Sequence, residues 1–323
     1  MHIFTNPNYN FLRWRWHAVA LSWIVILAGL FTIYTRGLPK GIEFAGGTSV
    51  IMQFDQTPSV EAVRNALIQN YPGGGQDAVV QTYGEPSLRQ VMVRVPTVGA
   101  EQGASLNASA QNVENALRKA NLGNFKVIGT EIVGPSVGKE LTQKGIWAFV
   151  LSLVGILAYI AFRFEFSFAA GAVIATLHDV LVTFAFLAFF RYDLSLNVIA
   201  ALLTVTGYST NDTIVIFDRV RENMRKMRRE SQNEIINLSI NQTLGRTVIT
   251  AGTALLSAIA LFLFGGEVLH GFAFTMLVGV ITGTYSSVFI AAAIVIIWQG
   301  RRPLKGQPAT PVTAAKPNRR RAS

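Results

Sequence analysis

Long apolar runs alternate with short polar stretches over most of this 323-residue chain, a pattern that predicts a membrane protein. A membrane-spanning helix needs about 20 consecutive, mostly apolar residues. Six segments meet that requirement, at residues 17–35, 145–162, 166–190, 196–217, 247–264 and 271–298. We therefore expect a polytopic α-helical membrane protein with six transmembrane helices.

The longest polar stretch, residues 36–144 after the first predicted span, has the pattern of a folded domain. Strand-like runs at 48–54, 78–83, 89–95 and 125–133 alternate with helical periodicity at 58–71 and around Val113 and Leu117. The resulting order, β-α-β-β-α-β, is typical of a ferredoxin-like α+β fold, in which two helices cover one face of a sheet. We expect Ser59 to begin the first of these helices, and mobile loops at 72–75 and 99–103.

Lys and Arg residues in the short connections set the expected orientation, because the cytoplasmic loops of membrane proteins are enriched in them. With the N-terminal segment 1–16 inside, most basic residues of the connections fall inside, whereas the two short outer loops hold only Arg191. Both termini are then cytoplasmic and domain 36–144 lies on the far, periplasmic side. Residues 145–298 complete the bundle, with a basic cytoplasmic loop at 218–246, and the basic tail at 299–323 is expected to be disordered.

Composition narrows the possible functions. The chain has no cysteine, which excludes disulfides and thiolate metal sites, and its four scattered histidines do not predict a metal centre. The net charge of +10 lies in segments that flank apolar spans, so we do not expect nucleic-acid binding. The sequence contains no motif for nucleotide binding, zinc proteases or serine hydrolases, and we expect neither enzymatic activity nor a bound cofactor.

Two carboxylates fall inside predicted spans, where a charge costs about 2.5–3.5 kcal/mol and usually marks an ion pathway. Asp212 lies in the fourth span and shares a helix face with Tyr208 and Arg219, so this face forms a polar stripe. A proton-carrying role fits, because burial and a nearby cation favour opposite charge states of a carboxylate. The alternative is a fixed hydrogen bond between helices. For Asp179, in the third span, both interpretations stay open.

Further charged residues near the fourth and fifth spans are candidates for the same pathway. Asp218 and Arg219 fall at the expected membrane boundary, where they either face the same crevice as Asp212 or are ordinary interfacial charges. Arg246, just before the fifth span, is at the same level and either tunes Asp212 or is one more positive-inside anchor. His178, beside Asp179, is more typical of a packing residue.

Small residues and the basic loop support two further predictions. Gly279, Gly283 and Ser287 recur every four residues in the last span, a spacing typical of close helix contact. In the loop at 218–246, apolar residues opposite the basic ones indicate a helix that contacts anionic lipid at the membrane surface. An ordinary solvated loop fits that pattern equally well.

Four segments together resemble the SecF family of bacterial protein-export subunits, which is related to the resistance-nodulation-division (RND) transporters. They are GIEFAGGT at 41–48, VGPSVG at 133–138, HDV at 178–180 and GYSTNDTIVIFDRVREN at 207–223, of which the last is the most specific. QTLGRT at 242–247 extends the resemblance into the fifth span. The first segment contains the family motif at Gly41, Glu43, Phe44, Gly46 and Gly47. Glu43 and Ala45 stand where Asp and Thr are usual.

The resemblance implies an RND-like half of six helices in the bacterial inner membrane. SecD would supply the other half, and the pair would use the proton motive force to promote preprotein export after translocation by SecYEG and SecA. YajC and the translocating preproteins are further implied partners. By motif, Asp212 matches the family's proton-relay aspartate and Arg246 its functionally important arginine, so protons would be the coupling ion.

Two other classes of function stay open from the sequence. The chain would be half of a proton-driven small-molecule or lipid exporter if it follows the related transporters, which share such bundles. It would be a purely structural assembly factor if neutralising Asp212 had no effect. An exporter is expected to assemble with an outer-membrane tunnel rather than with the export channel.

Overall fold

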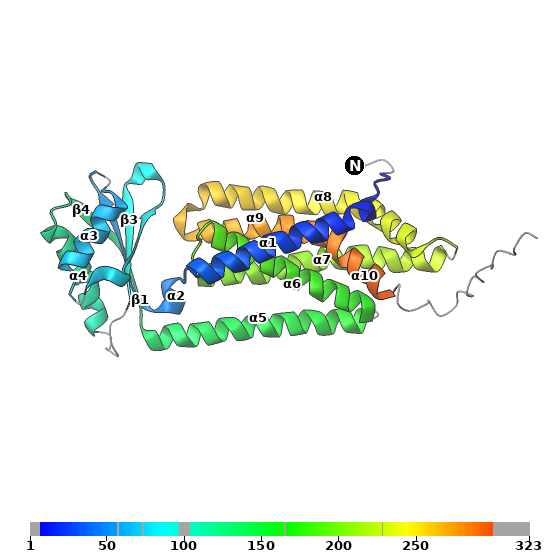
Figure 1. The fold of residues 1–323 in the computed structure, drawn as a ribbon, viewed down its shortest axis with the longest axis horizontal. Helices are drawn as coiled ribbons and strands as arrows, with labels where there is room; N and C mark the ends of the chain where they lie inside the picture. The colour runs from blue at the N-terminus through cyan, green and yellow to red at the C-terminus, as the bar shows by residue number, and fades with distance from the viewer. Residues whose placement is uncertain are drawn as a thin grey trace, which may run out of the picture.

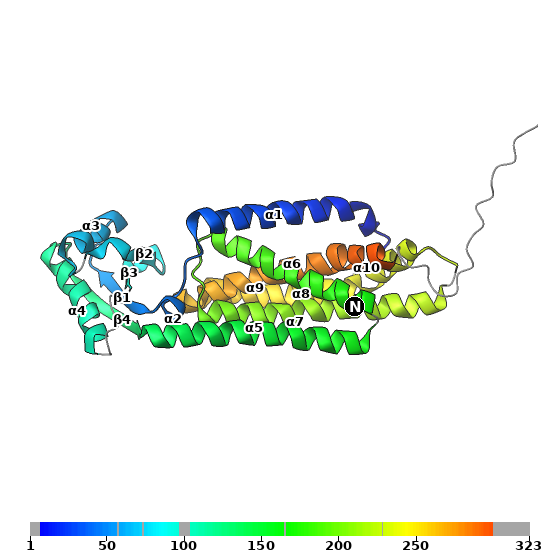
Figure 2. The same cartoon turned by 60° about the horizontal axis from the view of Figure 1, so that its bottom comes forward.

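The computed structural model of the protein describes residues 7–56, 58–72, 74–96, 104–164, 166–227 and 229–299. Long helices run side by side in a bundle, and a small sheet domain lies at one end of it (Figure 1). At the opposite end α1 begins and α5 and α7 finish (Figures 1 and 2). We call this the basic end, because these helix ends carry Arg or Lys residues. The predicted tail from residue 300 onward and the predicted loop at 99–103 lie outside the described residues.

The bundle consists of six long helical segments, and the last of them continues through a wide turn. The segments are α1 (Arg15–Arg36), α5 (Pro135–Arg163), α6 (Phe166–Phe189), α7 (Leu196–Lys226), α8 (Gln232–Phe264), α9 (Gly266–Ser286), a π-helical turn (Ser287–Ala291) and α10 (Ala292–Gln299). Over the described ranges, five helices are long and apolar enough to cross a membrane. α7, the predicted fourth span, is 31 residues long but more polar than these five.

Three helix boundaries extend beyond the predicted spans, because hydropathy marks only the apolar part of a helix. α5 begins at Pro135, ten residues before the predicted span, with proline in the first turn where its missing N–H is not needed. In the basic segment 218–246, where the sequence left a helix and a solvated loop open, α7 and α8 extend inward from both sides. Local contacts stabilise these polar ends: side-chain ion pairs within α7, and a capping box of Ser231 and Glu234 at the start of α8.

The sheet domain has four strands in the order β2-β3-β1-β4, and every neighbouring pair is antiparallel. Its elements are β1 (Gly47–Phe54), α3 (Val60–Asn70), β2 (Val79–Tyr83), β3 (Gln90–Val95), α4 (Ala104–Lys119) and β4 (Phe125–Val133). Both helices lie on the sheet face that points away from the bundle (Figure 1). Ser59 caps α3, as predicted, by accepting a hydrogen bond from the N–H of Ala62. The core between sheet and helices contains Val50, Met52, Phe54, Val63, Leu67, Val91, Val93, Val113 and Leu117.

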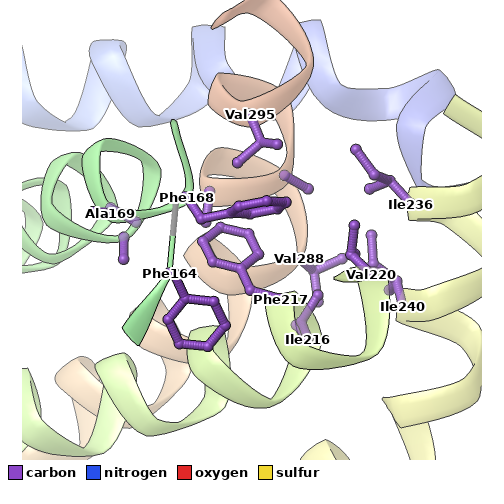
Figure 3. Close-up of a cluster of buried hydrophobic side chains, with 14 of the residues drawn as sticks. Phe164, Phe168, Ala169, Ile216, Phe217, Val220, Ile236, Ile240, Val288 and Val295 are labelled. Atoms are coloured by element: carbon purple, nitrogen blue, oxygen red, sulfur yellow. The ribbon is translucent and has the colours of Figure 1, made fainter. Parts of the chain in front are cut away.

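Aromatic and branched side chains fill the bundle near its basic end (Figure 3). The rings of Phe168 on α6 and Phe217 on α7 have centroids 5.1 Å apart. Val288 from the π-helical turn and Ile236 and Ile240 from the first turns of α8 complete this cluster. The cluster therefore fixes α6, α7, α8 and the last helix against one another.

Two glycines let α9 approach α7 closely, as their spacing predicts. A Cβ atom added at Gly279 would lie 2.4 Å from Cγ2 of Val205. One added at Gly283 would lie 2.8 Å from Cβ of Ser209. Since real Cβ atoms do not come so close to other atoms, only glycine permits this distance between the two helices.

Gly279→Ala is expected to lower the stability of the protein by about 1–3 kcal/mol, because the added methyl group forces α7 and α9 apart. Thermal unfolding of the purified protein in detergent measures the loss. Gly252→Ala on α8 is the matched control, since no atom lies within 4 Å of the added Cβ there. Equal melting temperatures for the two variants would contradict the close contact.

Candidate functional site

Asp212 is buried between α7 and α8, with only 8% of its surface exposed. The hydroxyl of Thr247 on α8 donates a hydrogen bond of 2.7 Å to its Oδ1. The other oxygen, Oδ2, is buried and has no hydrogen-bond partner among the described residues. Buried polar atoms are nearly always bonded in proteins, so an unpartnered carboxylate oxygen requires a functional or structural explanation.

Arg246 places a positive charge near this carboxylate. It directly precedes Thr247, where α8 becomes apolar, and its charge acts on Asp212 although no hydrogen bond from it reaches Oδ2. The apolar bundle favours a neutral carboxyl group, whereas a cation favours a charged one. The apolar surroundings and Arg246 therefore favour opposite charge states of Asp212.

A crevice of about 450 Å³ at the basic end lies next to this region. Its lining includes Asp218, Arg219 and Arg246, the three charged residues that the sequence places at the level of Asp212. Asp218 is largely exposed, and its carboxylate lies 3.7 Å from the guanidinium of Arg163. The crevice therefore brings the predicted charges together on the basic side of Asp212.

Arg219 is bonded to residues other than Asp212. Its Nε donates to Oε1 of Gln242 at 2.6 Å, and it forms an ion pair with Glu222. Hydrogen bonds from Lys226 and, to a smaller extent, from Arg219 hold the pKa of Glu222 below its usual value. Glu222 therefore stays ionised as the partner of Arg219. Arg246 is therefore the better candidate for the cation that acts on Asp212, and the relay role predicted for Arg219 and Asp218 stays a prediction.

Asp179 forms a second, separate cluster between α6, α7 and α9. Its exposed fraction is 0%. The hydroxyls of Ser209 on α7 and Ser286 on α9 both donate to its Oδ2, and Nδ1 of His178 lies 3.0 Å from its Oδ1. His178 is thus a partner of Asp179 and not simply a packing residue.

Neither Thr247 nor Ser286 is predicted from the sequence, although each donates a hydrogen bond to a buried carboxylate. Hydroxyl residues are frequent in these spans, and spacing within one helix does not show which of them faces a neighbouring helix. For Thr247 the only signal is its place directly after Arg246. Within the ranges described above, no group of three or more His, Asp or Glu residues is arranged to hold a metal ion.

The glycine-rich segment 41–47 joins α1 to the sheet domain. It forms one helical turn, α2 (Ile42–Ala45), which Gly41 precedes and Gly46 ends. Gly46 and Gly47 have φ angles of 71° and 127°, a region that glycine adopts without strain, and they direct the chain into β1. Glu43 and Phe44 lie within this turn, which packs against α5. The motif therefore belongs to the junction of the two parts of the molecule and not to the Asp212 site.

Main-chain and charge contacts strengthen this junction. The N–H of Gly41 donates to the carbonyl of Leu194 at 2.7 Å, and the N–H of Leu194 donates to the carbonyl of Pro39 at 2.8 Å. Arg94 of β3 and Asp193, which lies just before α7, form an ion pair of 2.7 Å with little solvent exposure. The sheet domain is thus bonded directly to the connection between α6 and α7.

Thr247→Val is expected to lower stability by about 1–3 kcal/mol, because the isosteric side chain leaves the buried carboxylate of Asp212 without its donor. Thermal unfolding in detergent at neutral pH measures the change. Thr247→Ser retains the hydroxyl and should melt close to the wild type. Thr253→Val is a second control, because that hydroxyl is exposed and bonds only within its own helix. A loss no larger in Thr247→Val than in Thr253→Val would refute the role of this hydrogen bond.

Two family models match the chain. The model for the C-terminal part of the protein export membrane proteins SecD and SecF matches residues 112–301, a range that contains Asp179, Asp212 and Arg246. The model for the SecD/SecF GG motif matches residues 31–58, which contain the junction segment 41–47. Together the two models cover the Asp212 site and the junction between α1 and the sheet domain.

Named relatives match nearly the whole chain. The protein translocase subunit SecF of Vibrio alginolyticus is 43% identical over 287 residues, which make up 89% of each chain. The subunit of the same name from Escherichia coli O157:H7 is 40% identical over 288 residues, 89% of this chain and 87% of that one.

Solved structures agree with these relatives. The crystal structure of SecDF, a translocon-associated membrane protein from Thermus thermophilus, superposes with a TM-score of 0.80 at 33% identity. The match covers 92% of this chain and 39% of the SecDF chain. SecDF in a super-membrane-facing form gives a TM-score of 0.65 at 34% identity, over 93% of this chain and 40% of that chain. On the evidence of its motifs, its fold and these matches, the chain belongs to the SecF family of protein translocase subunits.

Proposed function

We propose that this chain is an accessory subunit of a Sec protein translocase, which uses the proton motive force to promote preprotein export across the bacterial inner membrane. Relatives that are 40% and 43% identical over 89% of the chain are named protein translocase subunits. These names describe transport and not an enzymatic reaction. They give no support to the alternative of a small-molecule or lipid exporter.

The proposed architecture has six spans, with α7 as the sixth beside the five apolar helices. The polar residues of α7 do not argue against a span, because Ser209, Asp212 and Thr213 are all buried against other helices. For the sheet domain we propose a ferredoxin-like fold. The antiparallel order β2-β3-β1-β4, with two helices on one face, supports it.

The proposed orientation places the basic end in the cytoplasm and the sheet domain in the periplasm. Short cytoplasmic connections are enriched in Lys and Arg. The basic end holds Arg13, Arg15, Arg163, Arg219, Arg221, Arg225 and Lys226. The same side chains would contact anionic lipid headgroups, since clustered positive charges are attracted to that surface.

The observation that carries the proposal is the buried, unpartnered oxygen of Asp212. Arg246, whose charge acts on this carboxyl group, lines a crevice together with other charged residues. A carboxyl group in this setting binds a proton when the apolar environment dominates and releases it when the cation comes closer. Protons are therefore the coupling ion that we propose, with no other cofactor. The crevice lined by Asp218 and Arg219 would connect Asp212 to the basic end.

SecD is the first partner that we propose, and it would supply the second half of the assembly. This chain matches 39% of a SecDF chain, which supports a complex built from two such parts. The SecYEG channel, YajC and the translocating preprotein are further partners that the family implies. In this proposal the sheet domain contacts the preprotein, because it is the part of the chain outside the helix bundle.

Asp212→Asn is expected to abolish proton uptake and the stimulation of export by the proton motive force. The amide keeps the size of the side chain and accepts the Thr247 hydrogen bond, but it cannot take up a proton. Proton uptake into vesicles that contain the reconstituted complex, and preprotein translocation with and without a proton gradient, are the two measurements. Both should fall to the level of vesicles that lack this chain.

Glu140→Gln is the matched control for this experiment. It makes the same change from carboxylate to amide on α5, at an exposed position whose partner is Lys144 of the same helix. This variant should behave like the wild type in both assays. If Asp212→Asn also inserts normally and still supports stimulated export, the proton-carrying function is wrong.

A further inference from the structure

Both carboxylate oxygens of Asp179 are hydrogen-bonded to other side chains. Ser209 and Ser286 donate to Oδ2, and Nδ1 of His178 lies 3.0 Å from Oδ1. The carboxyl group therefore joins α6 to α7 and α9 through bonds that it makes within the protein. Since the group has an exposed fraction of 0%, no solvent replaces a lost donor.

Asp212 differs from Asp179 in each of these respects. It receives one hydrogen bond, from Thr247, and its second oxygen has no partner in the described part of the chain. Arg246, a cation whose charge acts on Asp212, lines the crevice at the basic end. One carboxylate is therefore arranged to change its partner or its proton, and the other is held in a fixed set of bonds.

A chain of hydroxyl contacts connects the two sites through α9. Ser286, which donates to Asp179, is followed by Ser287, the first residue of the π-helical turn. Oγ of Ser287 lies 2.7 Å from Oγ1 of Thr213, and Thr213 directly follows Asp212 in α7. π-Helical turns inside α-helices are rare and frequently occur at functional sites. The π-helical turn therefore begins where Ser286 is bonded to Asp179 and Ser287 to Thr213, the residue after Asp212.

A second connection runs through α7 itself. Ser209, the other donor to Asp179, lies three residues before Asp212, which is about one helical turn. Its carbonyl oxygen is 3.5 Å from Oγ of Ser287, and Gly283 provides the space for this contact. The turn of α7 that carries Asp212 is thus held at two points. Ser209, before Asp212, bonds Asp179 directly, and Thr213, after Asp212, contacts Ser287, the neighbour of the second serine that bonds Asp179.

We propose that Asp179 is a positioning residue for the Asp212 site: bonded to Ser209 and Ser286, it holds α7 and the π-helical turn so that Asp212 faces Thr247 and Arg246. The inference rests on the proton-carrying function proposed for Asp212 and assigns no proton transfer to Asp179. The sequence leaves two interpretations open for Asp179, a proton carrier and a fixed hydrogen bond between helices. The proposal selects the second, in which the hydrogen bonds position the Asp212 site.

The test compares Asp179→Asn with Asp179→Ala in the reconstituted complex. The asparagine oxygen accepts hydrogen bonds from both serines, and its N–H donates to Nδ1 of His178 when the ring proton is on Nε2. Unlike a carboxyl group, the amide cannot take up or release a proton near neutral pH. A positioning role predicts proton uptake per folded molecule close to the wild type for Asp179→Asn, and a loss of most of the uptake for Asp179→Ala. Thermal unfolding of each variant provides the folded fraction.

Ser287→Ala is a second variant, needed if Asp179→Ala does not fold. It leaves every bond of Asp179 in place and removes the contacts of Ser287 with Thr213 and with the carbonyl of Ser209, so uptake per folded molecule should fall. Ser257→Ala is its control, since that hydroxyl is exposed and bonds within α8. Infrared difference spectra report on the carboxyl group of Asp212 itself, and a change in overall stability does not alter its band position. The C=O band of protonated Asp212, identified by its loss in Asp212→Asn, should persist in Asp179→Asn and shift in Ser287→Ala.

Each result supports or overturns the inference. If Asp179→Asn loses uptake as completely as Asp212→Asn, Asp179 itself carries protons and the positioning role is wrong, while the proposed function stands. Normal uptake in Asp179→Ala or in Ser287→Ala overturns the connection between the two sites. Normal uptake in Asp212→Asn overturns both the proposed function and this inference.

Discussion

The hydrogen bonds that Asp179 accepts from α7 and α9 at the same time constrain the arrangement of the whole bundle. A carboxyl group buried in an apolar environment is unfavourable unless hydrogen-bond partners surround it. The two serine donors come from different helices, and α9 brings Ser286 close enough only because Gly279 and Gly283 allow the backbones to approach. Helix packing and the hydrogen bonds to this carboxyl group therefore require the same geometry.

Much of the secondary structure was predictable, because hydrophobic periodicity and capping are local properties of the chain. The cap at Ser59 and the order of the four strands are examples. The ends of the membrane helices were not predictable from hydropathy. α5 continues ten residues beyond its apolar part, and α7 and α8 continue into the basic segment between them, because polar side chains in water stabilise a helix that has already formed.

For the candidate site, the sequence identified the carboxylates and Arg246 but not the groups that bind them. A polar residue in a span is visible from its own helix, whereas Thr247 and Ser286 become partners only through the rotation and register of neighbouring helices. For Arg219 the sequence suggested a partner that the structure does not show. It shares a helix face with Asp212, yet Glu222 lies three residues away on its own helix and binds it instead.

The bonds at Asp193 and Leu194 could transmit movement between the sheet domain and the helix bundle. They attach the sheet domain to the residues just before α7, and Asp212 lies on the same helix about 26 Å further along its axis. A helix packed on several sides shortens and bends little, so a displacement at one end is transmitted to the other. In the proposed mechanism Asp212 binds a proton, and because coupling between two sites is reciprocal, a pulling load on the sheet domain would then alter how tightly that proton is held. A polypeptide that resists transport would, in that mechanism, also slow the proposed flow of protons.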